Sequence, residues 1–342
     1  MRALVTGGTG FLGQALVRAL LARGDAVSFC ARHNAPQLVA AGARFVPCDL
    51  ATPQAAEVLR VAGTGTDVIF HTAAKTGVWG SRADFMAINL GGTRALLAAL
   101  AELGSGAPAL VHTSSPSVCF DGRDHRRAGP DLPRGRHFPC AYPESKALAE
   151  EAVESAARET QLAVCILRPH LIYGPGDPHL LPRIIARARA GRLRRVGDGQ
   201  NEVSLCYIEH AVAAQLAAGD QLLAAGPAAP CAGRAYFIAD DEPVLLWPWI
   251  DELLQAAGLD PIRAQLPRRR AALLGAVLET LWRILPLSGE PPMTRFVAAE
   301  LSTSHSYDMG PARRDLGYRP SVGAQQARLL ALADLRERGL LP

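Results

Sequence analysis

Short apolar runs alternate with longer segments of helical periodicity over the first 170 residues of the chain. Nearly continuous apolar runs are typical of buried strands, and apolar residues that recur at helical spacing are typical of amphipathic helices. The predicted strands are residues 3–6, 26–31, 44–47, 68–71, 110–114 and 164–168. The predicted helices are residues 12–23, 51–62, 84–102 and 143–159. This order predicts an α/β fold, with a Rossmann-type, doubly wound parallel sheet covered by helices.

The pattern becomes less regular after about residue 170, where proline and glycine are frequent. The predicted elements there are a helix at 181–190 and strands at 202–208 and 234–238. This change of character indicates a main domain followed by a smaller C-terminal lobe. The expected main domain is residues 1–175, to which 203–225 return, and the smaller lobe is residues 176–202 and 226–342.

Residues 271–287 form the most apolar stretch of the chain, interrupted by Glu279 and Arg283. A stretch of this length with two charges is marginal for spanning a bilayer. We interpret it as a buried helix or a lid. The alternative is an interfacial helix resting on lipid, helped by the basic run Arg268, Arg269 and Arg270. That alternative predicts peripheral membrane contact through residues 268–287.

The composition, 49% apolar and 20% charged, is that of a folded globular protein. The net charge of +4 comes from scattered arginines rather than a dense stripe with interleaved aromatic residues, which argues against nucleic-acid binding. The seven cysteines are widely spaced without a CxxC pair, so we expect no metal site and free thiols in a reducing compartment. Met1 leads directly into a strand without a signal-peptide pattern. We therefore expect a cytoplasmic location, with membrane association as a further option.

Residues 6–13 read TGGTGFLG, which places Gly7, Gly10 and Gly13 at the turn from the first strand into the first helix. Glycines there allow a tight turn, close approach of the backbone to a pyrophosphate, and close packing of the helix on the strand. The helix N-terminus adds amide donors and a positive dipole for the anion. The motif predicts a dinucleotide site in the main domain, to which Phe11 and Leu12 also contribute.

The end of the second strand distinguishes between two dinucleotides. An acidic residue there would bind the ribose hydroxyls of NAD and repel a 2′-phosphate, but this chain has Ala31 followed by Arg32. A guanidinium suits a phosphate by charge and by geometry. We therefore expect NADP(H) to be preferred, with NAD(H) as the alternative. Further cofactor contacts are expected after the third and fourth strands, at Asp49, Leu50, Ala73, Ala74 and Lys75.

Residues 142–146 read YPESK, and on a helix this spacing places Tyr142 and Lys146 on one face. A nearby ammonium favours the phenolate and so lowers the pKa of the tyrosine. The chain has only two lysines against 34 arginines, which makes a chance match less probable. We predict that Tyr142 transfers a proton and that Lys146 tunes it and holds the nicotinamide ribose.

The segment HTSSPSV, residues 112–118, follows the fifth strand. We expect the hydroxyl of Ser115 to bind the substrate oxygen and stabilise the charge that develops on it, with Ser114 and Ser117 as alternatives. A hydrolase triad is not indicated, because the chain has no G-x-S-x-G nucleophile elbow.

Together these motifs resemble the extended short-chain dehydrogenase/reductases over essentially the whole chain. The matching segments are TGGTGFLG, HTAAKTG, INLGGTRALL, HTSSPSV, YPESK and RPHLIYGPGD. Within that superfamily the chain resembles the 3β-hydroxysteroid dehydrogenase branch, and there the bacterial 2-alkyl-3-oxoalkanoate reductases of olefin and β-lactone biosynthesis. This narrower likeness rests on AAKTGVWGS from Ala73, the segment from Arg168 and GEPPMTRFVAAELSTSHSYD from Gly289. CFDG at residues 119–122 is closer to the sterol-4α-carboxylate 3-dehydrogenases.

The resemblance implies a two-lobed fold, with the cofactor at the sheet edge and the substrate in a cleft beneath the smaller, substrate-binding lobe. The residues that it implies are Ser115, Tyr142 and Lys146 as the catalytic set, Asn89 in a supporting role and Pro169 against the nicotinamide. It also implies a homodimer formed by helices 84–102 and 143–159 and their symmetry mates.

The expected reaction is NADPH-dependent reduction of the 3-keto group of a lipophilic 2-alkyl-3-oxoalkanoic acid. The first alternative is a 3β-hydroxysteroid or sterol-4α-carboxylate 3-dehydrogenase that uses NAD(P), and the second is a non-catalytic dinucleotide-sensing protein. Both enzymatic reactions interconvert a β-hydroxy acid and a β-keto acid, and Arg32 favours reduction. The residues expected at the substrate are Lys75, as a cation for the carboxylate, Ser115, His170 and Tyr207.

Overall fold

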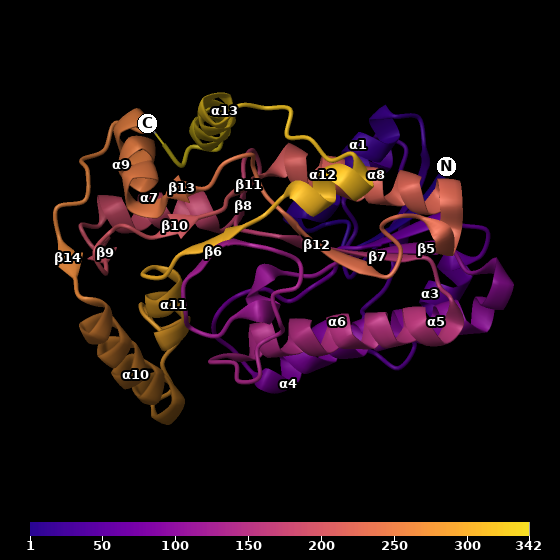
Figure 1. Ribbon diagram of the computed structural model, residues 1–342, viewed down its shortest axis with the longest axis horizontal. Coiled ribbons are helices and arrows are strands. Elements are labelled where there is room, and N and C mark those ends of the chain that lie inside the picture. Colours follow the sequence, from indigo (N-terminus) through magenta and orange to yellow (C-terminus); the bar gives the residue numbers. More distant parts are fainter. Residues whose placement is uncertain (342) are drawn as a thin grey trace.

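A seven-stranded parallel sheet forms the centre of the computed structural model, which describes residues 1–341 (Figure 1). The strand order is β12-β7-β5-β4-β1-β2-β3. The strands are β1 Arg2–Thr6, β2 Ala26–Ala31, β3 Arg44–Pro47, β4 Val68–His71, β5 Ala109–Thr113, β7 Val164–Pro169 and β12 Arg234–Ile238. The six strands predicted in the first 170 residues all form, each within one residue of its predicted ends. The doubly wound α/β fold is therefore confirmed.

Helices cover both faces of the sheet (Figure 1). On one face α1 (Phe11–Ala22) packs against α8 (Ile208–Ala225). On the other lie α3 (Ala55–Gly63), α5 (Gly92–Leu103) and α6 (Ala141–Thr160). Helix α3 begins later than its predicted start at residue 51, because the Ala51 amide and the Thr52 hydroxyl donate to Asp49 in a turn.

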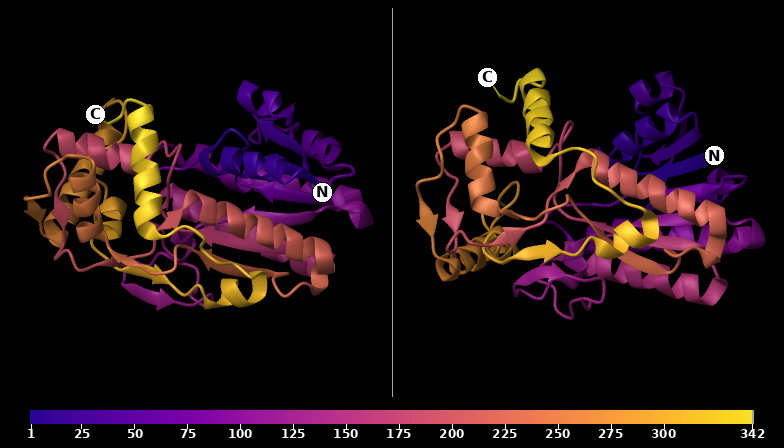
Figure 2. Two further views of the ribbon diagram at one scale, coloured as in Figure 1. Left: turned by 90° about the horizontal axis from the view of Figure 1, so that it is seen from above. Right: turned by 45° about the horizontal axis from the view of Figure 1, so that its top comes forward.

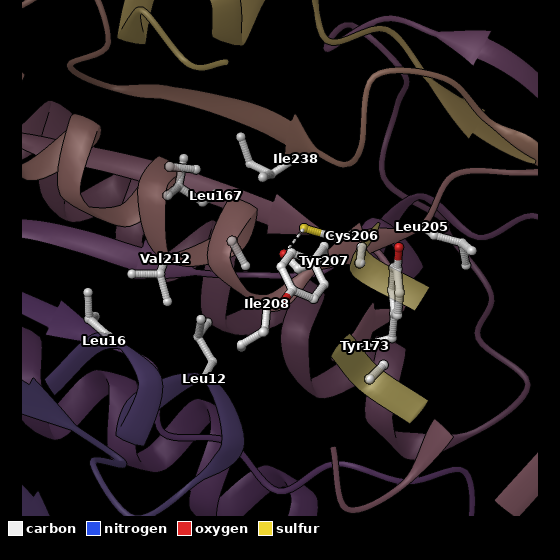
Figure 3. Packing of buried hydrophobic residues seen from close by; sticks show 14 of the residues in the cluster. Leu12, Leu16, Leu167, Tyr173, Leu205, Cys206, Tyr207, Ile208, Val212 and Ile238 are labelled. Atoms are coloured by element: carbon white, nitrogen blue, oxygen red, sulfur yellow. Dashed lines mark hydrogen bonds between the residues drawn. The ribbon is translucent and has the colours of Figure 1, made fainter. Parts of the chain in front are cut away.

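Burial of one apolar stripe fixes α1 on the sheet. Leu12 and Leu16 recur at helical spacing and lie in the same buried cluster as Ile208 and Val212 of α8 (Figure 3). Leu16 is fully buried. This layer holds the glycine turn that precedes α1 at the carboxyl edge of the sheet, where ligands bind in open α/β folds.

The helix predicted at residues 84–102 is interrupted in the structure, so that prediction is wrong in detail. It consists of α4 (Arg82–Phe85), a π-helical turn at Met86–Gly91, and α5. Asn89 in this turn is buried, and its Nδ2 donates to the carbonyl oxygen of Lys75 and to Oγ of Ser145. These tertiary hydrogen bonds favour the wider turn, which is often found at functional sites.

Strand β12 belongs to the main sheet, which corrects the expected lobe boundary. Residues 226–342 were assigned to the smaller lobe, but Arg234–Ile238 pairs in parallel with β7 along its whole length. Helix α12 (Gly310–Leu316) then packs on β12 and α8. An apolar run identifies a strand but not its neighbour, so the edge position of β12 could not be read from the sequence.

The smaller lobe is built around a four-stranded sheet of order β13-β10-β15-β6. These strands are β6 His125–Ala128, β10 Glu202–Val203, β13 Val244–Leu245 and β15 His305–Tyr307. The remaining helices are α2 Pro36–Ala40, which connects β2 to β3 in the main sheet, and, later in the chain, α7 Leu180–Arg189, α9 Leu246–Ala256 and α13 Ala324–Glu337. Two short strand pairs are also present: β8 Ile172–Tyr173 with β11 Cys206–Tyr207, and β9 Arg195–Val196 with β14 Gln265–Leu266. The single strand predicted at 202–208 is thus split between two sheets. In Figure 2 α13 crosses the smaller lobe, where its Arg328 pairs with Glu252 of α9.

Helix α10 (Arg268–Ile284) occupies the predicted apolar stretch and packs against α11 (Arg295–Glu300) at the periphery of the smaller lobe (Figure 1). Its inner face buries Ala271, Gly275 and Glu279. Its outer face and the turn after it expose the apolar side chains Leu273, Leu274, Val277, Leu281, Ile284, Leu285 and Leu287. The interpretation as a buried helix is therefore wrong. Within residues 1–341, no helix has the length and apolar character needed to cross a membrane.

We expect Leu16→Ala to lower the free energy of unfolding by about 2–5 kcal/mol, because it leaves a cavity between α1 and the sheet. The matched control is Leu329→Ala on α13, where the side chain is 54% exposed and the loss should stay below about 0.5 kcal/mol. Urea unfolding followed by circular dichroism measures both. Equal losses would show that the α1 layer does not hold the domain together.

Candidate active site

The turn between β1 and α1 requires glycine at two positions. Gly7 has a φ of +70°, and a Cβ there would lie 2.6 Å from Cα of Ala73. A Cβ on Gly13 would lie 2.1 Å from the carbonyl oxygen of Gly7. The amide of Gly7 donates to the carbonyl oxygen of Cys30 at 2.9 Å. The turn therefore fits closely between β2 and the segment after β4, and it opens onto the amides of the first turn of α1.

The other residues predicted at the cofactor border the same edge of the sheet. They are Gly10, Phe11 and Leu12 at the start of α1, Ala73 and Ala74 after β4, and Pro169 at the end of β7. Leu12 is buried in the core, so only its backbone can face a ligand. The carboxyl ends of parallel strands meet at one edge, and the structure brings these segments together there.

The residues predicted to bind the adenosine half follow β2 and β3. Arg32 is exposed directly after β2, and its guanidinium makes no ion pair with any of residues 1–341. Asp49 is also exposed, but its carboxylate already accepts a hydrogen bond from the amide of Ala51 at 3.0 Å. Leu50 packs closely on Gly92, since a Cβ built on Gly92 would lie 2.8 Å from Cβ of Leu50. Arg32 is thus the cation that stays available to a ligand.

Tyr142 and Lys146 lie one turn apart on α6, near the end of β5. Nζ of Lys146 donates to the carbonyl oxygen of Thr113 at 2.6 Å, and the side chain is buried. Desolvation lowers the pKa of Lys146 to about 8. Desolvation also raises the pKa of Tyr142, and a hydrogen bond with Ser115 opposes that shift. The phenol therefore holds its proton at neutral pH and can donate it.

Ser115 precedes a short 3-10 turn and faces Ser117. Its Oγ accepts hydrogen bonds from the amide of Ser117 at 3.2 Å and from the Ser117 hydroxyl at 3.0 Å. The alternative Ser114 is buried, and its hydroxyl donates to Glu150 at 2.5 Å. Of the two adjacent serines, Ser115 is therefore the one whose hydroxyl is placed toward Tyr142.

A buried ionic cluster that we did not predict lies behind this site. Glu150 follows Lys146 by one turn of α6 and is fully buried. Arg168 binds its carboxylate with two hydrogen bonds, of 2.6 and 3.0 Å. Arg134 contacts it at 3.2 Å. The spacing of four residues between Lys146 and Glu150 was the signal available in the sequence, because it places both on one helix face.

Lys75 is already engaged with other protein groups. Its ammonium pairs with Asp84 at 2.7 Å and lies 5.1 Å from the ring centre of Phe85. Its amide donates to Oδ1 of Asn89 at 2.7 Å. The predicted role as counter-ion for a substrate carboxylate is therefore poorly supported, because Asp84 neutralises the charge.

Two cavities lie beside the segments that carry Tyr142 and Ser115, and neither of these two residues lines them. The larger, of about 520 Å³, lies on the Tyr142 side and is lined by Trp79, Phe85, Phe138, Phe296 and the charged residues Arg82, Glu144, Glu279 and Arg283. The smaller, of about 20 Å³, lies on the Ser115 side and is lined by Ser117, Phe120, Arg123, His125, His170, Glu300 and His305. The rings of Phe120 and Phe296 meet edge to face, with centres 5.0 Å apart, so these two side chains stand between the cavities.

The other two residues predicted at the substrate, His170 and Tyr207, differ in their placement. His170 lines the small cavity. Tyr207 lines neither cavity. It is fully buried in the core beside Tyr173 (Figure 3), and its hydroxyl donates to Glu209 at 3.4 Å. Its position in β11, paired with β8, directs it into the core instead.

Comparison with known proteins gives a consistent result. The model of the 3-beta hydroxysteroid dehydrogenase/isomerase family matches residues 4–268. A 2-alkyl-3-oxoalkanoate reductase from Stenotrophomonas maltophilia is 44% identical, over 95% of this chain and 97% of its own length. The human sterol-4-alpha-carboxylate 3-dehydrogenase, decarboxylating, is 32% identical over 95% and 86%. Among solved structures, a dTDP-glucose 4,6-dehydratase from Streptomyces venezuelae with NAD bound has a TM-score of 0.76 at 25% identity, over 99% and 98%.

The lowered pKa of Lys146 predicts a pH dependence. Turnover that needs the ammonium should fall as the pH rises through about 8, because the proton is lost there. In Lys146→Arg the guanidinium stays charged, so the alkaline limb should move to higher pH even if turnover is lower. Initial rates at saturating substrate across the pH range measure this. A limb near the same pH in both proteins would assign it to another group.

Proposed function

The chain belongs to the 3-beta hydroxysteroid dehydrogenase/isomerase family, and on that basis we propose that it reduces the 3-keto group of a lipophilic 2-alkyl-3-oxoalkanoic acid with NADPH. It is an oxidoreductase of the extended short-chain dehydrogenase/reductase type. The observation that carries the proposal is the 44% identity to a 2-alkyl-3-oxoalkanoate reductase along nearly the whole of both chains. The 520 Å³ cavity beside Tyr142, with its four aromatic side chains, supports a lipophilic substrate.

The cofactor edge fits a dinucleotide phosphate. The turn at Gly7 and Gly13 leaves no room for a Cβ, as expected where the backbone must approach a pyrophosphate. Arg32 offers an exposed guanidinium that is free of ion pairs within residues 1–341, which supports binding of a 2′-phosphate. Lys146 and Pro169 would hold the nicotinamide half.

The residues of the site suit reduction of a ketone. When bound, NADPH supplies the hydride that reaches the carbonyl carbon. Tyr142 donates its phenolic proton to the carbonyl oxygen as that oxygen gains charge, and Ser115 donates a hydrogen bond to the same oxygen. The ammonium of Lys146 stabilises the phenolate left on Tyr142. A proton from solvent then restores the phenol.

A second candidate is oxidation of a 3β-hydroxy sterol acid. The human sterol-4-alpha-carboxylate 3-dehydrogenase covers 95% of this chain at 32% identity, and a dehydrogenase, as it is named, catalyses the oxidation rather than the reduction. The exposed Arg32, which has no ion pair among residues 1–341, favours reduction with NADPH over this alternative. A dinucleotide sensor has no need of a proton donor, so the placement of Tyr142 beside Ser115 argues against that class.

The predicted homodimer through residues 84–102 and 143–159 stays a prediction, as do the cytoplasmic location and the lipid contact through residues 268–287. Support for the lipid contact comes from the exposed apolar outer face of α10 together with the basic run Arg268–Arg270 at its start.

We expect Tyr142→Phe to bind NADPH normally and to lose turnover by about 100-fold or more, because the proton donor is removed. The control is Tyr236→Phe, which removes a hydroxyl bonded to Asp315 away from both cavities. NADPH oxidation is followed with an alkylated β-keto acid and with a 3-ketosteroid. Retained turnover in Tyr142→Phe would contradict the assigned proton donor, and exclusive use of the steroid would favour the second candidate.

Arg32→Ala should raise the KM for NADPH about tenfold or more and leave the KM for NADH nearly unchanged, because a charge-assisted hydrogen bond to the 2′-phosphate is lost. Arg44→Ala, at an exposed position on the neighbouring strand β3, is the matched control. Equal effects on both cofactors would show that Arg32 does not read the phosphate.

A further inference from the structure

The small cavity on the Ser115 side of the site has room for one or two oxygen atoms and for no alkyl chain, since its volume is about 20 Å³. Its lining brings His125, His170 and His305 together beside Arg123, with the rings of Phe120 and Tyr307 completing the wall. We propose that this cavity binds the carboxylate of the substrate, with His170 and Arg123 as its main contacts. The carboxylate site rests on the proposed function, because it presumes a 3-oxo acid.

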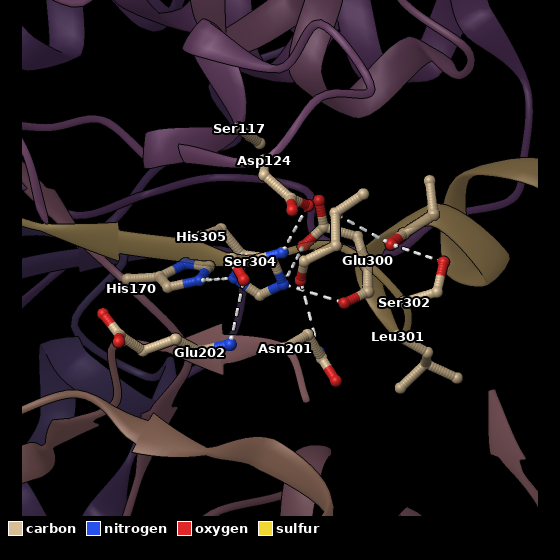
Figure 4. Close-up of polar contacts among 12 residues, drawn as sticks. Ser117, Asp124, His170, Asn201, Glu202, Glu300, Leu301, Ser302, Ser304 and His305 are labelled. Atoms are coloured by element: carbon tan, nitrogen blue, oxygen red, sulfur yellow. Dashed lines mark hydrogen bonds and ion pairs between the residues drawn. The ribbon is translucent and has the colours of Figure 1, made fainter. Parts of the chain in front are cut away.

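A hydrogen-bonded chain of two histidines defines the donor that faces the ligand (Figure 4). Nε2 of His305 lies 2.8 Å from the backbone carbonyl oxygen of Glu300, which can only accept, so this nitrogen carries a hydrogen. Nδ1 of a neutral His305 must then accept from Nε2 of His170, at 2.6 Å. The tautomers assigned from this network leave Nδ1 of His170 without a hydrogen. A further proton on the pair would therefore go to that nitrogen and make it a donor.

The charges around His170 and His305 favour binding of an anion that is coupled to uptake of a proton. Burial lowers the pKa of His170 well below its usual value, so the imidazole of His170 is neutral in the empty cavity. A bound carboxylate offsets this desolvation and draws a proton onto Nδ1. The guanidinium of Arg123 is exposed at the rim and makes no ion pair within residues 1–341.

Other titratable groups face the pair from the elements packed around it. The carboxylate of Glu300 lies 3.9 Å from Nε2 of His305, and desolvation raises its pKa, which limits its repulsion of a bound anion. His125 pairs with Asp121 at 3.1 Å, and Asp124 is occupied by the amide of Ser304 at 2.9 Å (Figure 4). Proton uptake is thus tied to the two histidines, and affinity for the acid should fall as the pH rises.

His170, Glu300 and His305 also have the residue types of a metal site, and each offers one potential ligand atom within 4.8 Å of the other two. However, the two nitrogens of His305 point to different partners, Nδ1 to His170 and Nε2 to Glu300. A metal ion could take only one of them. The arrangement is therefore a relay of hydrogen bonds.

The two cavities match the three arms of a 2-alkyl-3-oxo acid. The ketone would lie at Tyr142 and Ser115, and the alkyl chains would fill the large cavity on the Tyr142 side. The carboxylate is two bonds from the ketone carbon, which suits the adjacent small cavity. Ser117 connects the two sites, since its hydroxyl donates to Ser115 and it lines the small cavity. Lys75, which we predicted as the cation for the carboxylate, is held by Asp84.

The test compares 2-hexyl-3-oxodecanoic acid with its methyl ester, which has the same chains and ketone but no charge. Wild type should prefer the acid about tenfold or more in kcat/KM at neutral pH. Arg123→Ala and His170→Asn should each raise KM for the acid by about tenfold. The same two variants should change KM for the ester by less than about twofold, because the ester carries no charge. KM for the acid should rise with pH in wild type and vary less in His170→Asn. The matched control is Arg126→Ala, a neighbouring arginine that does not line the cavity.

Calorimetry gives a readout that does not need turnover. The 3-hydroxy acid, 2-hexyl-3-hydroxydecanoic acid, is titrated into the enzyme with NADPH, which cannot accept a hydride from it, in buffers of different ionisation enthalpy. Wild type and Arg126→Ala should take up about one proton on binding, and His170→Asn should take up none.

Equal changes for acid and ester in the variants, or binding of the hydroxy acid without proton uptake, would overturn the carboxylate site and leave the cavity as a place for water. If His170→Asn does not fold, Arg123→Ala still tests the carboxylate site, because Arg123 is exposed and its replacement should not affect folding. Proton-coupled binding without turnover of either acid or ester would instead contradict the proposed reaction and retain the carboxylate site.

Discussion

Glu150 carries a fully buried carboxylate at the junction of α6 with the ends of β5 and β7. A charge in that position is tolerated only when it is paired and fully hydrogen-bonded, and Arg168 and Ser114 meet this requirement. Ser114 directly precedes Ser115, and Lys146 lies one turn before Glu150. Any shift of one segment against the others would break hydrogen bonds to a buried charge. The ionic cluster therefore holds the serine, the lysine and the cofactor edge as one unit.

Burial of this unit shifts the pKa values of the groups around it in different directions. Desolvation lowers the pKa of Lys146 to about 8 and raises that of Tyr142. The same loss of solvent lowers the pKa of His170. At neutral pH the site thus combines a protonated phenol, a cationic lysine and an uncharged imidazole. Such a set can donate a proton to a ketone without exposing it to bulk water.

The sequence was sufficient for features that depend on local pattern. The strands of the main sheet, the glycine turn and the Tyr142–Lys146 spacing all follow from periodicity or from motifs a few residues long. The π-helical turn could not be predicted, because it depends on hydrogen bonds from Asn89 to distant segments. His170 and His305 are 135 positions apart, so nothing local indicates that they touch. The ion pair of Lys75 with Asp84 could not be predicted for the same reason, since it forms only in the fold.

The wall between the two cavities has a consequence for how a branched molecule enters. Phe120 belongs to the segment after β5, whereas Phe296 belongs to α11 in the smaller lobe. Each lobe therefore supplies one ring of the partition. A branched molecule with an arm in each cavity could enter only while the two rings are apart, so its binding would be coupled to the relative position of the lobes.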